Sequence, residues 1–271
     1  MLEIRSTAEL IKPENFKLKI LIFGLHGSGK TTFMATAQHL GAGICETGCG
    51  RGLLSVATKT FDYVELNSYE DYDAFCSGAV FKDKATLGLD SLSEAVRTII
   101  KDKTMSIHRA KGDSAKRAAG VMELDDYGVN AELTRKLLKK LIDQPKNIVV
   151  TSGLRIDRPD METGQGETLI GPDLSGQMFL GSTAMFDLCL CLRTRSVLRD
   201  PKDAKSRYTQ RYFMTENNGS GILAKNRLSV QGGKSFLPSE VIFDPENNQG
   251  TFDYFYNLAI SEYTRFINER K

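Results

Sequence analysis

Residues 24–31 carry the feature that most constrains what this chain can fold into. They run from Gly24 to Thr31 in the pattern G-x-x-x-x-G-K-[ST], the phosphate-binding P-loop. An apolar stretch at 17–23 precedes the loop and is typical of a buried strand, and a helix-like stretch at 32–40 follows it. Because a P-loop lies between a strand and a helix, these flanks favour it over a glycine-rich turn with an incidental lysine.

The residue types of the loop indicate how it would hold a nucleoside triphosphate. Glycines allow backbone N–H groups to turn towards phosphate oxygens, and the start of the following helix adds partial positive charge. Lys30 is expected to reach the β- and γ-phosphates, and the hydroxyl of Thr31 to bind Mg²⁺. The loop residues expected to contact ATP are Gly24, Gly27, Ser28, Gly29, Lys30, Thr31 and Thr32.

A later stretch supplies an acid for the metal ion. The apolar segment 84–89 ends at Asp90, as a Walker B strand does, so we expect Asp90 to anchor Mg²⁺ together with Thr31. The alternative is that Asp90 caps the helix predicted at 91–100. Asp187 is a poorer metal candidate because it precedes its strand.

Strand-like and helix-like segments alternate through the rest of the core. Strands are predicted at 42–46 and 147–152, and the apolar spacing over 130–143 predicts a helix. This alternation favours a mostly parallel sheet with helices on both faces. Ligands of such sheets bind at the carboxyl ends of the strands, which is where Glu46 and Ser152 are expected.

Composition limits the class of protein. Of 271 residues, 41% are hydrophobic and 26% charged, which is ordinary for a globular protein and excludes a collagen-like or disordered chain. No apolar run is long enough to cross a bilayer, so we expect a cytoplasmic protein with no membrane partner. The net charge of +2 neither indicates nor excludes nucleic-acid binding. We expect an extension at 1–16, an ATPase core at 17–243 and a C-terminal helix packed on the core at 244–271.

The five cysteines argue against a disulfide framework, because their number is odd. A zinc site made from Cys45, Cys49, Cys189 and Cys191 is conceivable, but their spacing is not that of a known ligand pair. Buried, reduced thiols are the interpretation we favour.

Taken in order, these landmarks resemble the RecA-like ATPases, and they look closest to the phage nucleotide-binding proteins that include single-strand annealing ATPases. The resemblance runs from about residue 18 to residue 233. It rests on the P-loop, the strand ending at Glu46, the Leu89-Asp90-Ser91 segment, the segment 171–177 and the late segment 224–227. It implies a RecA-like α/β fold with a mostly parallel central sheet, helices on both faces and a C-terminal β-hairpin extension.

The resemblance also implies roles for particular residues. Glu46 would polarise the water that attacks ATP, and Ser152, beside Thr151, would sense the γ-phosphate. Lys225 and Arg227 would reach the nucleotide of a neighbouring subunit, which implies self-association into a ring or filament with shared ATP sites. Other interpretations stay open: Glu46 could be a surface glutamate in a turn, and the two late cations could lie on a solvated edge strand.

Single-stranded DNA is the partner that the resemblance implies. The loop at 155–168 is at the expected place, but its acidic residues weaken that interpretation. The stretches 101–117 and 193–211 are more basic, and the second is predicted to be a protruding hairpin with Tyr208 and Tyr212 beside its cations. Either stretch could instead be a solvated loop.

The leading hypothesis is an ATP-hydrolysing RecA-like protein, slow or DNA-stimulated, that uses Mg²⁺ and binds single-stranded DNA in phage-type recombination or strand annealing in the host cytoplasm. A nucleotide-gated assembly protein with slow ATPase activity and no DNA role is the main alternative. A small-molecule kinase is a third, less favoured because no basic lid is evident.

Overall fold

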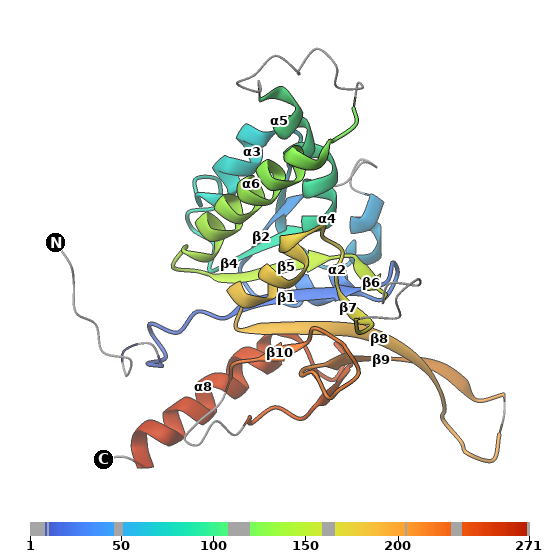
Figure 1. The fold of residues 1–271 in the computed structure, drawn as a ribbon. Helices are drawn as coiled ribbons and strands as arrows, with labels where there is room; N and C mark the ends of the chain where they lie inside the picture. Colours follow the sequence, from blue (N-terminus) through green and yellow to red (C-terminus); the bar gives the residue numbers. More distant parts are fainter. Residues whose placement is uncertain are drawn as a thin grey trace.

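The computed structural model describes residues 9, 11–45, 51–107, 120–158, 166–203, 205–228 and 235–269. Within these ranges, nine strands form one sheet in the order β11-β9-β8-β1-β5-β4-β2-β3, with β10 paired to β8 (Figure 1). Its strands are β1 (Lys19–Gly24), β2 (Leu40–Ile44), β3 (Asp62–Glu65), β4 (Thr86–Asp90), β5 (Asn147–Ser152), β8 (Leu188–Leu198), β9 (Arg207–Met214), β10 (Lys225–Asn226) and β11 (Glu240–Phe243). A separate two-stranded sheet pairs β6 (Leu154–Asp157) with β7 (Leu169–Pro172).

The pairing confirms the predicted sheet. The six neighbours from β8 through β1, β5, β4 and β2 to β3 are parallel, whereas β9, β10 and β11 pair antiparallel. Strand β5 lies between β1, which leads into the P-loop, and β4, which ends at Asp90. All parallel strands therefore end at one edge of the sheet, on the P-loop side.

Helices cover both faces, as predicted. The helical segments are α2 (Lys30–Met34), η1 (Arg51–Val56), α3 (Tyr69–Cys76), α4 (Leu92–Ala95), η2 (Val96–Ile100), α5 (Lys101–Ser106), α6 (Leu124–Ile142), α7 (Gln177–Gly181), η4 (Thr183–Met185) and α8 (Phe252–Glu269). Because side chains alternate along β1, Leu21 and Phe23 join the core beneath α3, α4 and α6, while Ile20 and Ile22 join the core with α2 and α8. Figure 1 shows these two layers on opposite sides of the sheet.

The helix after the P-loop is shorter than the sequence predicted. The prediction of a helix over 32–40 was wrong, because α2 ends at Met34 and β2 already begins at Leu40. Thr36 explains part of this end: its hydroxyl donates to the carbonyl of Phe33 at 2.6 Å and accepts the backbone N–H of Phe252, at the start of α8, at 2.9 Å. The end of α2 is therefore fixed by a tertiary contact that no local pattern reveals.

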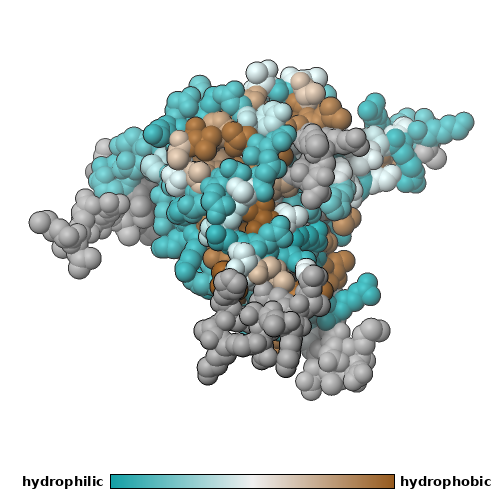
Figure 2. Space-filling view, turned by 90° about the horizontal axis from the view of Figure 1, so that it is seen from above, coloured by the Kyte–Doolittle hydropathy of each residue, from teal (hydrophilic) through white to brown (hydrophobic). Residues whose placement is uncertain are grey.

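Strands β8 and β9 form the predicted basic hairpin. The residues of β8 are buried from Leu188 to Leu192, where it pairs with β1, and become exposed from Arg193 onward. The outer part pairs only with β9, so the ribbon projects beyond the sheet (Figure 1). Seen from above, this projecting arm is largely hydrophilic (Figure 2).

The C-terminal helix α8 packs on the core, on the face of the sheet that also holds α2. Phe252, Phe255 and Ala259 are fully or almost fully buried there. The rings of Phe213 on β9 and Phe255 are 5.9 Å apart, in an edge-to-face arrangement. On the same face Phe16, which precedes β1, lies 5.6 Å from the ring of Tyr263.

Candidate nucleotide-binding site

The P-loop turns between the end of β1 and the start of α2. Gly27 and Gly29 have φ angles of 74° and 108°, a left-handed region that strains residues with a side chain. Gly24 is required for a different reason, because a Cβ there would lie 2.6 Å from the carbonyl oxygen of Leu192 on the adjacent strand β8. The glycines at these positions thus let the loop turn and let β1 lie tightly against its neighbour.

Lys30 is held over the loop by the loop's own backbone. Its ammonium group donates to the carbonyl oxygens of Gly24 at 3.0 Å and Leu25 at 2.9 Å. Burial lowers the pKa of Lys30, and the negative charge of Asp90 opposes part of that shift. A half-buried cation of this kind gains a strong partner when phosphate oxygens enter the loop.

Asp90 joins the P-loop to the strand beside it. Its Oδ2 accepts a hydrogen bond of 2.6 Å from Thr31, and its Oδ1 accepts one of 2.5 Å from Thr151 on β5. The predicted pairing of Thr31 with Asp90 is therefore present in the structure. A hydroxyl and a carboxylate oxygen are hard ligands of the type that Mg²⁺ prefers, so the donor set fits this ion.

Asp90 is followed by the cap of the next helix. The Ser91 hydroxyl accepts the backbone N–H of Glu94 at 3.4 Å, so Ser91 rather than Asp90 is the N-cap of α4. The alternative in which Asp90 caps this helix is thereby excluded, and the carboxylate is left to face Thr31.

Ser152 lies beneath the site rather than in its lining. The residue is fully buried, and its hydroxyl is 2.9 Å from the hydroxyl of Ser93 and accepts the N–H of Asp173 at 3.1 Å. Ser93 also accepts the N–H of Gly153 at 2.9 Å. This network ties the end of β5 to α4 and to the segment after β7. Direct contact between Ser152 and the γ-phosphate stays a prediction.

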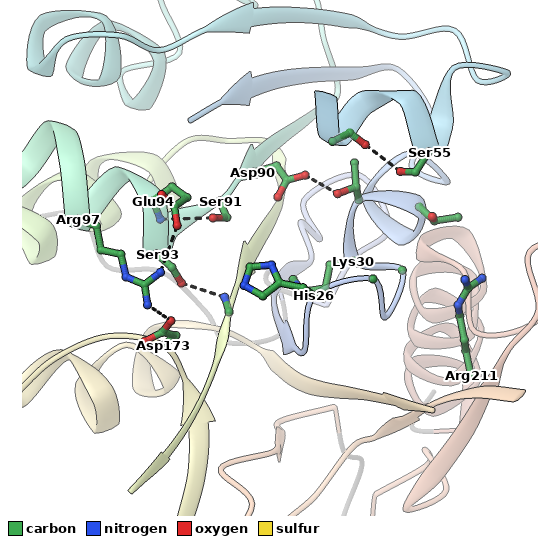
Figure 3. A pocket seen from close by; sticks show the side chains of 16 residues that line it. His26, Lys30, Ser55, Asp90, Ser91, Ser93, Glu94, Arg97, Asp173 and Arg211 are labelled. Atoms are coloured by element: carbon green, nitrogen blue, oxygen red, sulfur yellow. Dashed lines mark hydrogen bonds and ion pairs between the residues drawn. The ribbon is translucent and has the colours of Figure 1, made fainter. Parts of the chain in front are cut away.

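A cavity of about 390 Å³ opens above the P-loop (Figure 3). Besides loop residues and Asp90, the cavity is lined by side chains for which no role was predicted from the sequence, namely those of His26, Ser55, Ser91, Ser93, Glu94, Arg97, Asp173 and Arg211. Arg97 bridges Glu94 at 3.2 Å and also pairs with Asp173. Glu94 lies in the first turn after Asp90, and this spacing is a local signal that could have revealed it.

The sequence profile of the AAA domain family matches residues 16–228. The chain belongs to this AAA domain family. The matched residues include the P-loop, Asp90 and the late segment 224–227, and they leave α8 outside. The family and the site together make the chain a P-loop ATPase, with the mostly parallel sheet covered by helices that the sequence predicted, and they imply a nucleotide and Mg²⁺ as its ligands.

No curated protein matches the sequence. The fold is similar to that of the flagellar accessory protein FlaH from Methanocaldococcus jannaschii, which is 10% identical, with a TM-score of 0.40 over 83% of this chain and 84% of that chain. It is also similar to the KaiC-like protein PH0186 from Pyrococcus horikoshii OT3, which is 12% identical, with a TM-score of 0.39 over 84% and 85% of the two chains.

One predicted catalytic residue of this AAA domain, Glu46, lies outside the described residues. Strand β2 nevertheless ends beside the site, because Ile44 pairs with Asp90 and the N–H of Cys45 donates to the carbonyl of Asp90 at 2.7 Å. The role of Glu46 stays a prediction.

Lys225 and Arg227 lie far from the P-loop of their own chain. Lys225 pairs with Cys189, and the N–H of Arg227 donates to the carbonyl of Asp187, at the start of β8. In the parallel register Gly24 lies three residues beyond the level of Lys225 and five beyond that of Arg227, roughly 10 and 17 Å at the usual rise along a strand. Any contact of these cations with ATP therefore requires the nucleotide of another copy.

Both late cations already bind backbone carbonyls. The Lys225 ammonium donates to Thr183 at 2.8 Å and to Phe186 at 3.1 Å, and the Arg227 guanidinium donates to Ala184 at 2.7 Å. Both side chains thus supply hydrogen bonds to backbone carbonyl groups in and beside η4. Lys225 is half-buried whereas Arg227 is exposed, so Arg227 is the better placed of the two to reach a neighbour.

The cysteines and the helices bear on two further sequence expectations. Burial raises the pKa of Cys189 and Cys191 to about 12, which keeps both thiols protonated. Among the described residues, no three His, Cys, Asp or Glu side chains gather in a way that could hold a metal ion. In the same ranges, no helix combines the length and apolar character that a bilayer crossing needs.

Proposed function

We propose that this chain hydrolyses ATP with Mg²⁺ and binds single-stranded DNA, acting in phage-type recombination or strand annealing. The ATP half is supported by the family and by the geometry of Lys30, Thr31 and Asp90. The DNA half rests on one observation, which is the cationic and aromatic face of the β8–β9 hairpin.

In the hydrolysis step, water attacks the γ-phosphorus, the bond to the β–γ bridging oxygen breaks, and the products are ADP and inorganic phosphate. Lys30 neutralises charge on the β- and γ-phosphates. Thr31 and Asp90 hold Mg²⁺, which supplies further charge neutralisation when bound. We assign the removal of the proton from water to Glu46, in keeping with the resemblance of the chain to RecA-like ATPases.

One face of the hairpin carries arginines on β8 and tyrosines on β9. Arg193 lies directly opposite Tyr212, and Arg195 and Tyr208 lie further out on the same face. The Arg195 guanidinium is 4.4 Å from the centre of the Tyr212 ring, and that of Arg199 is 5.4 Å from the centre of the Tyr208 ring. Flat aromatic and guanidinium surfaces stack nucleobases, and the positive charges attract the phosphate backbone.

The other basic stretches offer less support. In the loop after β5, Arg155 donates to the carbonyl of Leu174 at 3.2 Å, pairs with Asp157 at 3.3 Å and lies over the ring of Phe179. Its cation is thus already engaged within the chain. Arg195 of the hairpin also pairs with Glu240, at 2.9 Å, but within the described residues Arg193 and Arg199 form no ion pair. Much of the stretch 101–117 lies outside the described residues.

Fluorescence anisotropy with a labelled oligothymidine tests the DNA half. We expect binding at low salt that weakens steeply as salt rises. The double variants Arg195→Gln/Arg199→Gln and Tyr208→Leu/Tyr212→Leu should each lose about tenfold or more in affinity, given the usual worth of a stacked base. The control Lys136→Gln/Lys139→Gln removes the same charge from exposed positions on α6 and should bind as the wild type does.

Absence of oligothymidine binding at low salt, or equal losses in the hairpin and α6 variants, would contradict the DNA half. Steady-state ATP turnover with and without the oligonucleotide tests its link to hydrolysis. We expect stimulation by DNA in the wild type.

The second candidate function is a nucleotide-gated assembly protein without a DNA role. The exposed position of Arg227, away from its own P-loop, favours it. Light scattering with ATP and Mg²⁺, without DNA, discriminates: ATP-dependent assembly in a protein that binds no oligothymidine supports this second function. ATP-dependent assembly together with DNA binding supports a ring or filament on DNA.

A further inference from the structure

Arg211 extends from the hairpin to the P-loop. It lies on the hairpin face opposite to that of Tyr212, directly across from Phe243 on β11. A Cβ built on Gly29 would lie 3.3 Å from both Cδ and Nε of Arg211, and 3.5 Å from the Phe243 ring. The arginine stem therefore runs over the last glycine of the loop, and the residue lines the same cavity as Thr32 (Figure 3).

Within the described residues, no hydrogen bond or ion pair holds the guanidinium of Arg211. The neighbouring cations differ: Arg97 pairs with two carboxylates, Arg195 with Glu240 at 2.9 Å, and Arg207 donates to Ser196 at 3.5 Å. A guanidinium that lacks a counter-ion beside an anion-binding loop is suited to bind an anionic ligand.

The position of Arg211 indicates which part of the nucleotide it meets. Asp90 and the Glu94–Arg97 group mark the metal side of the cavity, where the γ-phosphate and Mg²⁺ are expected. Figure 3 shows Arg211 on the opposite side, with the loop and Lys30 between the two groups. Since a P-loop lysine reaches the β- and γ-phosphates, the α-phosphate must lie on the side away from the metal.

We propose that Arg211 binds the α-phosphate of the nucleotide held in the P-loop of its own chain. This assignment rests on the proposed binding of ATP at that loop. It makes Arg211 a nucleotide-binding residue that the P-loop pattern does not contain. Because ADP and ATP share the α-phosphate, Arg211 must contribute to the binding of both.

Isothermal titration calorimetry with ADP and with the β,γ-imido analogue of ATP, each with Mg²⁺, tests the proposal. Arg211→Gln should weaken both ligands by about tenfold to a hundredfold, the usual effect of losing a hydrogen bond to a charged group. Arg211→Lys should recover part of that loss, because it keeps the charge without the planar fork. Arg211 is exposed, and a thermal melt confirms that each variant is folded.

Arg207→Gln is the matched control, because Arg207 lies on the same face of β9, four residues further out. It should bind both nucleotides as the wild type does. Equal binding by the Arg211→Gln and Arg207→Gln variants would overturn the proposal, as would a loss confined to the triphosphate analogue, which places the contact at the γ-phosphate. If the wild type itself bound neither ligand, the proposed ATPase function would fail as well.

Discussion

Thr151 donates a hydrogen bond of 2.5 Å to Oδ1 of Asp90, and both residues are buried. The hydroxyl comes from the strand between the P-loop strand and the Asp90 strand. It fixes one carboxylate oxygen, so that the other faces Thr31 and the expected metal position.

Thr151→Val should disturb both stability and metal use. It keeps the shape but leaves Oδ1 without this partner, so the free energy of unfolding should fall by about 1–3 kcal/mol. The Mg²⁺ concentration for half-maximal ATPase activity should rise, because the carboxylate loses its orientation. Thr134→Val is the control, since the buried Thr134 hydroxyl donates only within α6. Urea unfolding and Mg²⁺ titration check both, and equal Mg²⁺ dependence in the two variants would contradict this account.

Gly24→Ala should damage the loop through the neighbouring strand. The new Cβ would lie 2.6 Å from the Leu192 carbonyl oxygen, so the backbone must move. We expect a loss of about 1–3 kcal/mol in the free energy of unfolding, as for other overpacked sites, together with weaker ADP binding. In Gly128→Ala on α6 the new Cβ meets nothing within 4 Å, so stability should stay the same or rise. A Gly24→Ala protein as stable as the wild type would contradict this prediction, because it would mean that β8 can move away from the new methyl group without cost.

Stability at alkaline pH should depend on Lys19. Burial lowers the pKa of this lysine to about 8, below the 10.5 of an exposed lysine. Between these values the folded protein has released a proton that the unfolded chain still holds, so this group's contribution to stability rises with pH. From pH 7.5 to 10 the gain should be about 2 kcal/mol larger in the wild type than in Lys19→Met. Urea unfolding at both pH values measures this gain. Parallel pH profiles of stability in the wild type and in Lys19→Met would contradict a lowered pKa of Lys19.

Two glutamates compete for the role of catalytic base. Glu94 lines the cavity but is engaged by Arg97, whereas Glu46 is the candidate that the resemblance implies. Glu46→Gln should therefore retain ATP binding and lose most turnover, by a factor of about a hundred or more. Glu94→Gln should retain most of its turnover. Single-turnover ATP hydrolysis distinguishes the two, and the reverse pattern would transfer the role to Glu94.

Shared sites between subunits predict complementation. Arg227→Ala should hydrolyse ATP poorly if Arg227 acts on a neighbour's nucleotide, and Lys30→Ala should be inactive because its own loop is damaged. Mixing the two proteins should restore activity at sites that combine an intact loop with an intact Arg227. Unimpaired hydrolysis by Arg227→Ala alone, or no gain on mixing, would leave Arg227 with only its contact to Ala184.

Local pattern was sufficient to predict the turn between β1 and α2 and the meeting of Thr31 with Asp90. The glycines, Lys30 and Thr31 are constrained by backbone conformation and phosphate chemistry within a few residues of chain. Asp90 followed from the rule that parallel strands end at one edge of the sheet. The end of α2 could not be predicted, because it depends on a bond between Thr36 and α8.

The other residues that line the cavity could not be predicted from the sequence, because they also depend on tertiary contacts. Asp173 and Arg211 reach the cavity from segments that are distant in the chain, and only the register of β8, β9 and β11 brings Arg211 over Gly29. The stretch 193–211 was recognised as basic, but the sequence did not show which cation would turn inward. The burial of Ser152 likewise depends on Ser93 and Asp173, on two other segments.

Arg211 and Tyr212 are consecutive residues of one strand, and consecutive side chains point to opposite faces. The ribbon is stiffened by its pairing with β8 and β11, so it cannot bend freely between them. Because Arg211 is assigned to a phosphate that ATP and ADP share, it would respond to whether the P-loop is filled or empty, and a displacement of Arg211 on nucleotide binding would also move Tyr212. Nucleotide occupancy and contact with DNA would then be coupled across a single peptide bond.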